Sequence, residues 1–343
     1  MSSKLFGTVA VIFLVFFLSR EGVEISHIQE EGGGLQGREF RWKTGPPFLQ
    51  AANVSGEDWI SVKDPTVVRH RNRWHLFYTL RGRQRSHAIG YVSFSEFCDA
   101  PAAEQTVLQC HNGFFCAPQV FYFTPHKKWY LICQASDKSW NPEYQAAYTT
   151  TTDISDPRSW SPLQPLGTQP ADGKSGLDFW IICDEAKAHL FFTTLDGRMW
   201  REESLLKNFP KGWSLPTLAL QGDIFEASHT YRLIGSNTYL TLVEAQGGHG
   251  WRYFKAYAAD RLEGEWKPLA AEKERAFASM QNVHQVGERW TDCISHGELI
   301  RSGSDQRLRV NPVGLKFLFQ GVTDREREGK KYGEIPWRLG ILE

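Results

Sequence analysis

The sequence predicts an all-β fold, a five-bladed β-propeller, and three observations support this. Short runs rich in Val, Ile, Phe, Tyr and Thr are separated by clusters of Gly, Asn, Asp or Pro, which is the pattern of strands and turns. From residue 63 onward one layout of three strands recurs with a period of roughly 50 to 70 residues, and no long segment has helical periodicity. Such repetition is typical of blades around an axis, whereas a sandwich or jelly roll, the alternative, would lack the larger period.

Each predicted blade has a short first strand, a strongly apolar second strand and a third strand of alternating character. We place these strands at residues 65–70, 73–80 and 87–94; 117–124, 128–135 and 144–152; 177–184, 188–195 and 197–204; 226–234, 238–245 and 252–259; and, in a weaker fifth unit, 293–302, 306–311 and 315–321. The first strand of a blade lines the central axis, so residues that open these strands should converge on one mouth.

The N-terminal segment differs from the rest of the chain. Residues 5–18 form an uninterrupted apolar run after Lys4, about as long as the apolar region of a secretory signal and short for a membrane span. We predict a signal peptide or N-terminal membrane anchor over residues 1–20, a flexible linker rich in Gly and acids over 21–39, and one propeller domain over 40–343. The domain is therefore expected to be secreted, or tethered to the outer surface.

Net charge and aromatic content indicate which classes of binding partner the protein has. Lys plus Arg and Asp plus Glu both number 39, so the formal net charge is zero and a nucleic-acid partner is disfavoured. Aromatic residues make up 13% of the chain, which suits strands packed face to face and also surfaces that stack on sugars.

The six cysteines have no spacing typical of metal ligands, so a zinc site is not expected. Cys133, Cys183 and Cys293 lie inside apolar segments and are predicted to be buried free thiols. Cys98, Cys110 and Cys116 lie in a loop-like stretch where one disulfide could form.

Three acids open the innermost strands of three predicted blades. They are Asp64 in the first unit, Asp178 in the third and Glu226 in the fourth. Carboxylates brought together in this way repel each other, so at least one should have a raised pKa and hold a proton near neutral pH. An acid beside a base is what glycoside hydrolysis requires. Each acid alone could be a turn former or a solvated strand end, but three at blade openings favour a catalytic site.

His296 opens the fifth unit and should also face the central channel. A single histidine there could be a hydrogen-bonded core residue, or it could meet a channel water or a cation. The DxDxDG pattern of a calcium loop is absent, so any calcium ion would need ligands from scattered positions.

The sequence also resembles a known family through an ordered series of motifs. These include "WISVKDPTVV" (59–68), "APQVFYFTPHKKWYLICQ" (117–134), "SGLDFWIICDE" (175–185), "NFPKGW" (208–213), "FEASHTYRL" (225–233), "WTDCISHGELIRSGSDQRLRVNP" (290–312) and "YGEIPWRLGIL" (332–342). Over residues 40–343 the chain resembles glycoside hydrolase family 62, the α-L-arabinofuranosidases.

The resemblance implies an inverting enzyme that removes single arabinofuranosyl branches from arabinoxylan, and possibly from arabinan. It also implies roles for the site residues: Asp64 as general base, Glu226 as general acid, and Asp178 as the residue that orients the acid and tunes its pKa. The resemblance further implies that His296 lies near one structural calcium ion in the central channel. The protein is expected to act as a monomer on polysaccharide.

Sugar contacts carry over from the resemblance as well. The residues that match positions lining the arabinose pocket or the adjoining xylan groove are Lys63, Gln134, Trp140, Arg252 and Tyr332. Gln134 and Arg252 could equally be ordinary strand-end residues. Some family members have Asn after the tyrosine matched to Tyr332, where this chain has Gly333, so the preference of that subsite is left open.

Two other functions compete with this one. The related family 43 shares the plan of three carboxylates and includes β-xylosidases and arabinanases, although "FEASH" and "ISHG" favour family 62. The chain could also be a catalytically silent sugar-binding propeller, but a binding module gains nothing from crowding Asp64, Asp178 and Glu226 together.

Overall fold

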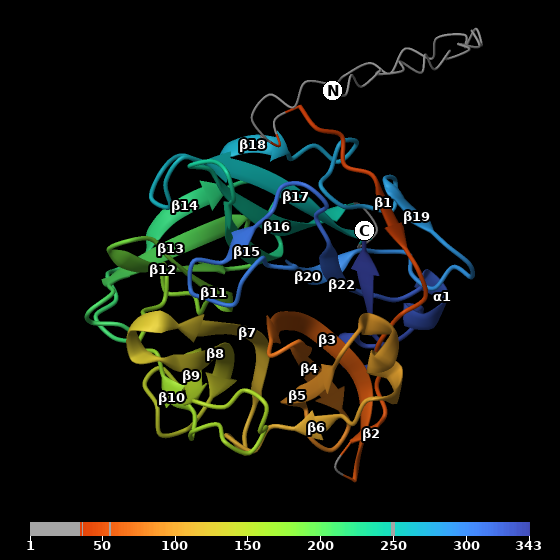
Figure 1. The fold of residues 1–343 in the computed structure, drawn as a ribbon, viewed down its shortest axis with the longest axis horizontal. Helices are drawn as coiled ribbons and strands as arrows, with labels where there is room; N and C mark the ends of the chain where they lie inside the picture. The colour runs from red at the N-terminus through yellow and green to blue at the C-terminus, as the bar shows by residue number, and fades with distance from the viewer. Residues whose placement is uncertain (1–34, 36, 55, 248–250) are drawn as a thin grey trace, which may run out of the picture. The chain divides into compact units, whose positions relative to one another are not determined.

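The computed structural model describes residues 35, 37–54, 56–247 and 251–343 (Figure 1). The predicted signal peptide or anchor, residues 1–20, lies outside the described residues, as does most of the predicted linker. Within the described part, Leu35 is buried in the main hydrophobic core and Arg38 donates to the carbonyl of Pro312, so packing of the domain reaches at least to Leu35. No helix in the described part of the chain is long and apolar enough to cross a membrane.

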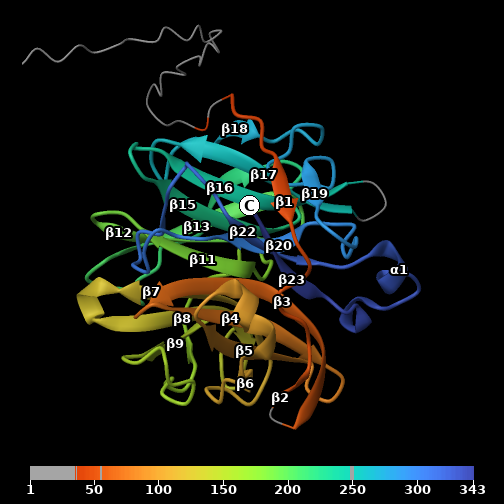
Figure 2. The ribbon, with the colours of Figure 1, turned by 45° about the vertical axis from the view of Figure 1, so that its right-hand side comes forward.

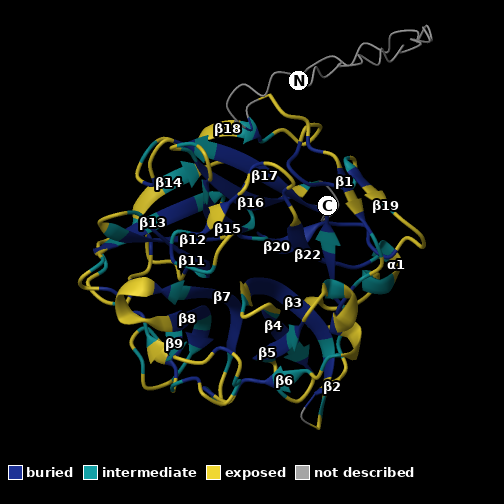
Figure 3. Ribbon diagram, viewed as in Figure 1, coloured by how far each residue is buried: buried dark blue, intermediate teal, exposed yellow. Residues whose placement is uncertain are grey.

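The predicted five-bladed propeller is confirmed. Five sheets follow one another along the chain, and all are antiparallel except for one short parallel strand in the fourth. Their innermost strands gather around the middle of the domain (Figure 1): β3 (Glu57–His70), β7 (Phe115–Phe123), β11 (Leu177–Cys183), β15 (Glu226–Leu233) and β20 (Ser295–Leu299). The view turned by 45° again places β3, β7 and β11 next to one another (Figure 2). The innermost strands are almost wholly buried, and the exposed residues lie on the outer strands and loops (Figure 3). Burial on both faces explains the mostly apolar sequences of β7 and β11, whereas β15 and β20 bury polar side chains as well.

The first three blades contain the strands that the sequence predicts, together with short outer strands. Blade 1 contains β2 (Asn53–Val54), β3 (Glu57–His70), β4 (Arg73–Gly82), β5 (His87–Phe94) and β6 (Thr106–Val107). Blade 2 contains β7 (Phe115–Phe123), β8 (Lys128–Ser136), β9 (Tyr144–Thr151) and β10 (Gln164–Pro165). Blade 3 contains β11 (Leu177–Cys183), β12 (Lys187–Thr193), β13 (Arg198–Leu205) and β14 (Thr217–Gln221).

A segment that was predicted to belong to blade 5 is found in blade 4. Blade 4 contains β15 (Glu226–Leu233), β16 (Tyr239–Gly247), β17 (Trp251–Ala259), β18 (Lys267–Ala270) and β21 (Arg309–Val310). Blade 5 contains β20 (Ser295–Leu299), β22 (Phe317–Gly321) and β23 (Arg338–Leu342). The predicted middle strand at 306–311 was therefore wrong, because β21 pairs in parallel with β15 instead, and the third strand of blade 5 is β23.

The two ends of the described chain meet in blade 5. β1 (Trp42–Thr44) pairs in parallel with β19 (Val283–Gln285). Lys43 and Glu343 exchange backbone hydrogen bonds, and Leu339 bonds to Phe48 and Leu49 further along. The segment 42–49 thus lies along β23 and completes the fifth blade, so the ring of blades is closed by hydrogen bonds between the start and the end of the domain.

Every innermost strand carries a shift of register where it enters the site. The shifts fall between Lys63 and Thr66, Cys116 and Gln119, Leu177 and Trp180, Glu226 and His229, and Ser295 and Gly297. In the first four blades a residue within the bulge has positive φ: Asp64 (50°), Ala117 (51°), Asp178 (54°) and Ala227 (53°). Left-handed backbone is costly for residues other than Gly, and a bulge re-aims a side chain. A strained bulge repeated in four blades is thus a built feature that aims side chains at the axis.

A single α-helix, α1 (Asp324–Arg327), is found in the described residues, apart from short 3₁₀ turns. All six cysteines are free thiols, so the disulfide considered among Cys98, Cys110 and Cys116 is absent from the structure. Cys133, Cys183 and Cys293 are buried, as predicted.

Glu202 is a buried carboxyl of blade 3 that makes stability depend on pH. Its side chain is fully buried, one oxygen accepts the backbone N–H of Gln169, and burial raises its pKa to about 8. An unfolded chain releases this proton at the ordinary pKa of Glu, near 4.5. Between those two pH values the folded state binds more protons, so the free energy of unfolding should fall as pH rises.

We expect Glu202→Gln to match the wild type at pH 5 and to be more stable than it at pH 8, as measured by urea unfolding. Glu203→Gln is the matched control, because that neighbouring carboxylate is paired with Lys187 and Arg201 and its pKa is lowered. An equal gain in both variants, or no gain at pH 8 in Glu202→Gln, would contradict the assignment.

Candidate active site

Asp64 and Asp178 reach the axis from equivalent positions of blades 1 and 3. Each is the positive-φ residue of its bulge, and each side chain is buried. Glu226 is not equivalent to them, although the sequence analysis treated the three together. It pairs with Glu244 just before the bulge, as Lys63 pairs with Thr79 and Leu177 with Thr193, so Ala227 holds the position of the two aspartates. The longer side chain of Glu226 brings its carboxyl to the site from one residue earlier.

Asp64 lies among groups that favour its ionised form. The Lys63 ammonium is 3.8 Å and the His296 Nδ1 is 3.4 Å from Asp64 Oδ1. Burial alone would raise the pKa of Asp64, but Lys63, His296 and the Thr79 hydroxyl outweigh it and lower this pKa. A buried carboxylate that stays ionised can accept a proton from water.

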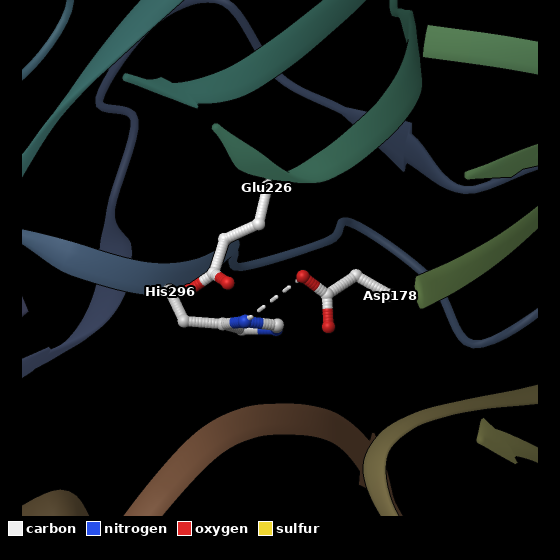
Figure 4. A group of neighbouring side chains, drawn as sticks. All are labelled: Asp178, Glu226 and His296. Carbon is white, nitrogen blue, oxygen red and sulfur yellow. Dashed lines mark ion pairs between the residues drawn. The ribbon is translucent and has the colours of Figure 1, made fainter. Parts of the chain in front are cut away.

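Asp178, Glu226 and His296 converge from three different blades (Figure 4). One ligand atom from each lies within 4.8 Å of the others, and His296 Nδ1 is 3.8 Å from Asp178 Oδ2. Burial and the carboxylates of Glu226 and Asp64 raise the pKa of Asp178 well above its ordinary value, although the Ala227 N–H bond opposes this rise. Asp178 can therefore keep a proton, and the neighbouring Glu226 side chain is the more exposed of the two, at 13% against 5%.

Arg252 joins Glu226 to a carboxyl that the sequence analysis missed. Its Nη1 is 2.6 Å from Glu226 Oε1, 3.1 Å from Glu244 Oε1 and 3.0 Å from Ser295 Oγ. Glu244 is fully buried, and burial raises its pKa to about 7 even though Arg252 opposes this. The one sequence signal for Glu244 was a charged residue inside the apolar run "TYLTLVEA". Arg252 is itself buried, so its observed contacts are with the acid rather than with solvent.

Tyr332 covers the two cations of the site. Lys63 Nζ lies 4.9 Å and Arg252 Cζ 5.3 Å from the centre of its ring, while the residue remains 48% exposed. The ring thus contacts buried charge, and the residue borders solvent where a sugar could pack. A Cβ at Gly333 would lie 2.4 Å from the Arg81 guanidinium, so the glycine makes room for that side chain.

The other two residues predicted to contact sugar, Gln134 and Trp140, have different surroundings from each other. Gln134 accepts the Asp178 N–H at 2.9 Å and donates to Cys116 Sγ, so its observed role is to hold a bulge. Trp140 stacks on His111. His111 lines a hollow of about 790 Å³, together with other residues among 109–114, 136–138, 143, 160, 162 and 163. None of the residues lining that hollow belongs to the carboxylate cluster.

The cluster offers part of a calcium site. Asp178, Glu226 and His296 could each give one ligand atom. Calcium prefers six to eight oxygen ligands, however, while Arg252 already holds one oxygen of Glu226 and Ala227 holds one of Asp178. The residues fit an ion only if water supplies most of its ligands.

Comparison with known proteins identifies the family. The profile of glycosyl hydrolase family 62 matches residues 48–343. The chain is 38% identical over 310 residues to alpha-L-arabinofuranosidase C of Cellvibrio japonicus, a match that covers 88% of this chain and 47% of that protein. The chain therefore spans about half the length of this curated relative.

Solved structures agree. The catalytic domain of a family 62 α-L-arabinofuranosidase from Coprinopsis cinerea has a TM-score of 0.82 and 36% identity, covering 89% of this chain and 96% of that one. A family 62 hydrolase in complex with xylotriose has a TM-score of 0.81 and 33% identity, covering 92% and 99%. A family 43 glycoside hydrolase shares the fold, with a TM-score of 0.53 and 13% identity over 86% and 91%. The profile match over most of the chain, supported by these relatives, decides between the two families: the chain belongs to glycosyl hydrolase family 62.

Proposed function

We propose that the protein is an inverting α-L-arabinofuranosidase that removes single arabinofuranosyl branches from arabinoxylan. The observation that carries the proposal is the convergence of Asp64, Asp178 and Glu226 on one axial site. Membership of family 62 and the names of its relatives support the same activity.

In the proposed reaction Asp64 is the base. It is ionised beside Lys63 and His296, and it takes a proton from the water that attacks the anomeric carbon. Glu226 donates a proton to the leaving oxygen as the glycosidic bond breaks. Asp178 orients Glu226 and tunes its acidity for this step. Water attacks from the face opposite the leaving group, so the configuration is inverted.

An inverting mechanism requires a certain distance between the two catalytic carboxyls. The carboxyls of Asp64 and Glu226 should be roughly 6.5 to 9.5 Å apart, which leaves room for the water between base and sugar. A crystal structure with a spacing near 5 Å would favour a retaining mechanism instead.

The substrate is best tested by identifying the released sugar. Purified protein would be incubated with wheat arabinoxylan, with arabinan and with an aryl α-L-arabinofuranoside. The proposal expects arabinose from arabinoxylan and from the aryl glycoside. Release of xylose would favour a family 43-like activity, and no turnover of the aryl substrate at high enzyme concentration would favour a sugar-binding propeller.

We also propose that one calcium ion binds near His296, with water completing its ligands. Its role would be to hold the blades in register, because the site offers few protein oxygens for polarising a substrate. We expect exhaustive chelation to lower the melting temperature, and added calcium to restore it. If chelation changes neither the melting temperature nor the activity, the proposed calcium site is wrong.

Export and a monomeric state remain part of the proposal. The apolar run at residues 5–18 supports export, either as a secreted protein or tethered at the outer surface. Sequencing the N terminus of the exported protein would distinguish a cleaved signal from a retained anchor, and sedimentation would report the oligomeric state.

A further inference from the structure

A chain of hydrogen bonds joins the proposed base to the proposed acid. It begins at the backbone of Asp64 in blade 1, passes through two side chains of blade 5 and ends at Glu226 in blade 4. The four bonds run from Asp64 N to Gln320 Oε1 (2.9 Å), from Gln320 Nε2 to Ser295 Oγ (3.1 Å), from Arg252 Nη1 to Ser295 Oγ (3.0 Å) and from Arg252 Nη1 to Glu226 Oε1 (2.6 Å). The chain therefore crosses the junction between the last blade and the first.

Ser295 lies in the middle of this chain, and its hydroxyl group has no bonding capacity left. A hydroxyl has one hydrogen to donate and two lone pairs to accept with. The Ser295 oxygen accepts from Gln320 and from Arg252, so its hydrogen is left to donate, and it donates to Glu244 Oε1 at 3.0 Å. All three bonds of the hydroxyl are made to protein groups, which fixes its orientation.

The chain is shielded from water. Ser295, Gln320 and Glu244 are fully buried, while Arg252 and Asp64 are 9% and 5% exposed. A buried polar network whose members have their partners is rigid. Movement at one end of the chain should therefore be felt at the other.

The two ends of the chain carry the two groups that must act on the sugar. Gln320 binds the backbone N–H of Asp64, a residue with positive φ at its bulge. Arg252 binds one oxygen of the Glu226 carboxyl. An inverting enzyme needs its acid and its base at a set separation, and small misplacements of reacting groups are costly to rate.

We propose that Ser295 is a positioning residue for both catalytic carboxyls, which helps to fix their separation by joining the amide of Gln320 to the guanidinium of Arg252. The inference rests on the proposed hydrolase function. Ser295 acts through these two side chains and not by contact with the substrate.

The test compares Ser295→Ala with Ser228→Ala. Ser228 is the matched control because it is also a fully buried serine at the bulge of an innermost strand, and among the described residues its hydroxyl has no hydrogen-bond partner. For Ser295→Ala we expect kcat on arabinoxylan to fall by roughly ten- to a hundredfold with little change in KM. Ser228→Ala should keep the kcat of the wild type. Calcium is kept in excess, so that weaker binding of an ion beside His296 is not mistaken for the effect.

An aryl arabinofuranoside separates the two ends of the chain. Its leaving group needs little protonation, so its hydrolysis reports the position of the base more than that of the acid. Ser295→Ala should lower kcat on this substrate as well, although by less than on arabinoxylan. A loss confined to arabinoxylan would mean that Ser295 serves the acid alone, and the proposed link to the base would be wrong.

A double-mutant cycle tests whether the chain acts as one unit. Gln320→Met removes the amide that binds Asp64 and Ser295. If Ser295 acts on the base through this amide, the double variant should turn over the aryl substrate about as fast as the slower single variant. Losses that multiply would show two independent effects and would overturn the inference.

The outcomes separate the inference from the proposed function. If the wild type cleaves arabinofuranosides but Ser295→Ala has an unchanged kcat, the positioning role is wrong and the proposed function stands. A lower melting temperature with unchanged kcat would make Ser295 a structural residue only. A wild type without turnover would defeat the proposed function, and the inference with it. If Ser295→Ala does not fold, Ser295→Cys against Ser228→Cys makes the same comparison with a thiol, a weak donor and acceptor, and equal kcat values there would also contradict the positioning role.

Discussion

Replacing Glu226 with Gln is expected to lower the release of arabinose from arabinoxylan by about two to four orders of magnitude, the usual worth of general acid catalysis. The amide keeps the shape of the side chain but has no proton to give to the leaving oxygen. An aryl arabinofuranoside has a leaving group that needs little protonation. Its cleavage by Glu226→Gln should therefore be partly restored, which steady-state kinetics on both substrates would measure.

Asp64→Asn provides the contrast within the same assay. This variant loses activation of water, which both substrates need, so it should stay inactive on both. Asp178→Asn should alter the pH profile as well as the rate, because Asp178 holds the proton of the pair. If the activated substrate rescued Asp64→Asn and not Glu226→Gln, the roles of acid and base would have to be exchanged.

Replacing Arg252 with Met should cost about 3 to 5 kcal/mol of unfolding free energy, the usual result of removing one partner of a buried ion pair. The guanidinium lies 2.6 Å from Glu226 and 3.1 Å from Glu244, so its loss leaves two carboxyls without their cation. Urea unfolding of the purified variant would measure the loss. Adding Glu244→Gln to the Arg252→Met variant should recover part of it, because one of the stranded charges is then gone.

Arg232→Met is the control for this experiment. Arg232 also pairs with a carboxylate, that of Glu185, but the glutamate side chain is 63% exposed. Such surface pairs contribute little, about 0 to 1 kcal/mol. Similar losses in Arg252→Met and Arg232→Met would mean that the buried network is not a stabilising element.

The parts of the fold that the sequence predicted are those with local signals. The first four blades each repeat strands and turns within a short stretch, and the pattern of apolar runs locates them. Blade 5 was predicted less well because its third strand, β23, comes after a long connection, while 306–311 has the composition of a strand but pairs with β15. Which sheet a short strand joins depends on its neighbours in space, and a local pattern of apolar residues does not reveal them.

The site residues also fall into those that a local sequence signal predicted and those that it did not. Asp64, Asp178 and His296 were predicted to open innermost strands; each lies at the bulge of such a strand, and the structure brings them together with Glu226. Glu244 was missed because it lies in the middle of an apolar strand and reaches the site through the pairing of β16 with β15, which no residue pattern reveals. Trp140 was assigned to a sugar contact from a polar loop, and its observed partner is His111.

The closure of the ring has a consequence for how the protein is made. Contacts that complete blade 1 come from far along the chain: Gln320 binds Asp64 across 256 residues, and Ile335 binds Ser61 across 274. Folding that depends on such distant contacts is slow, and partly assembled sheets expose edges that aggregate. The first three blades need no strand from beyond residue 221, whereas blade 4 needs β21 and blade 5 needs residues 295–342, so the ring stays open until the last part of the chain has been made. The nascent chain should therefore remain inactive and in need of protection by chaperones, and hydrolysis should begin only when the last strand has docked beside the first segment.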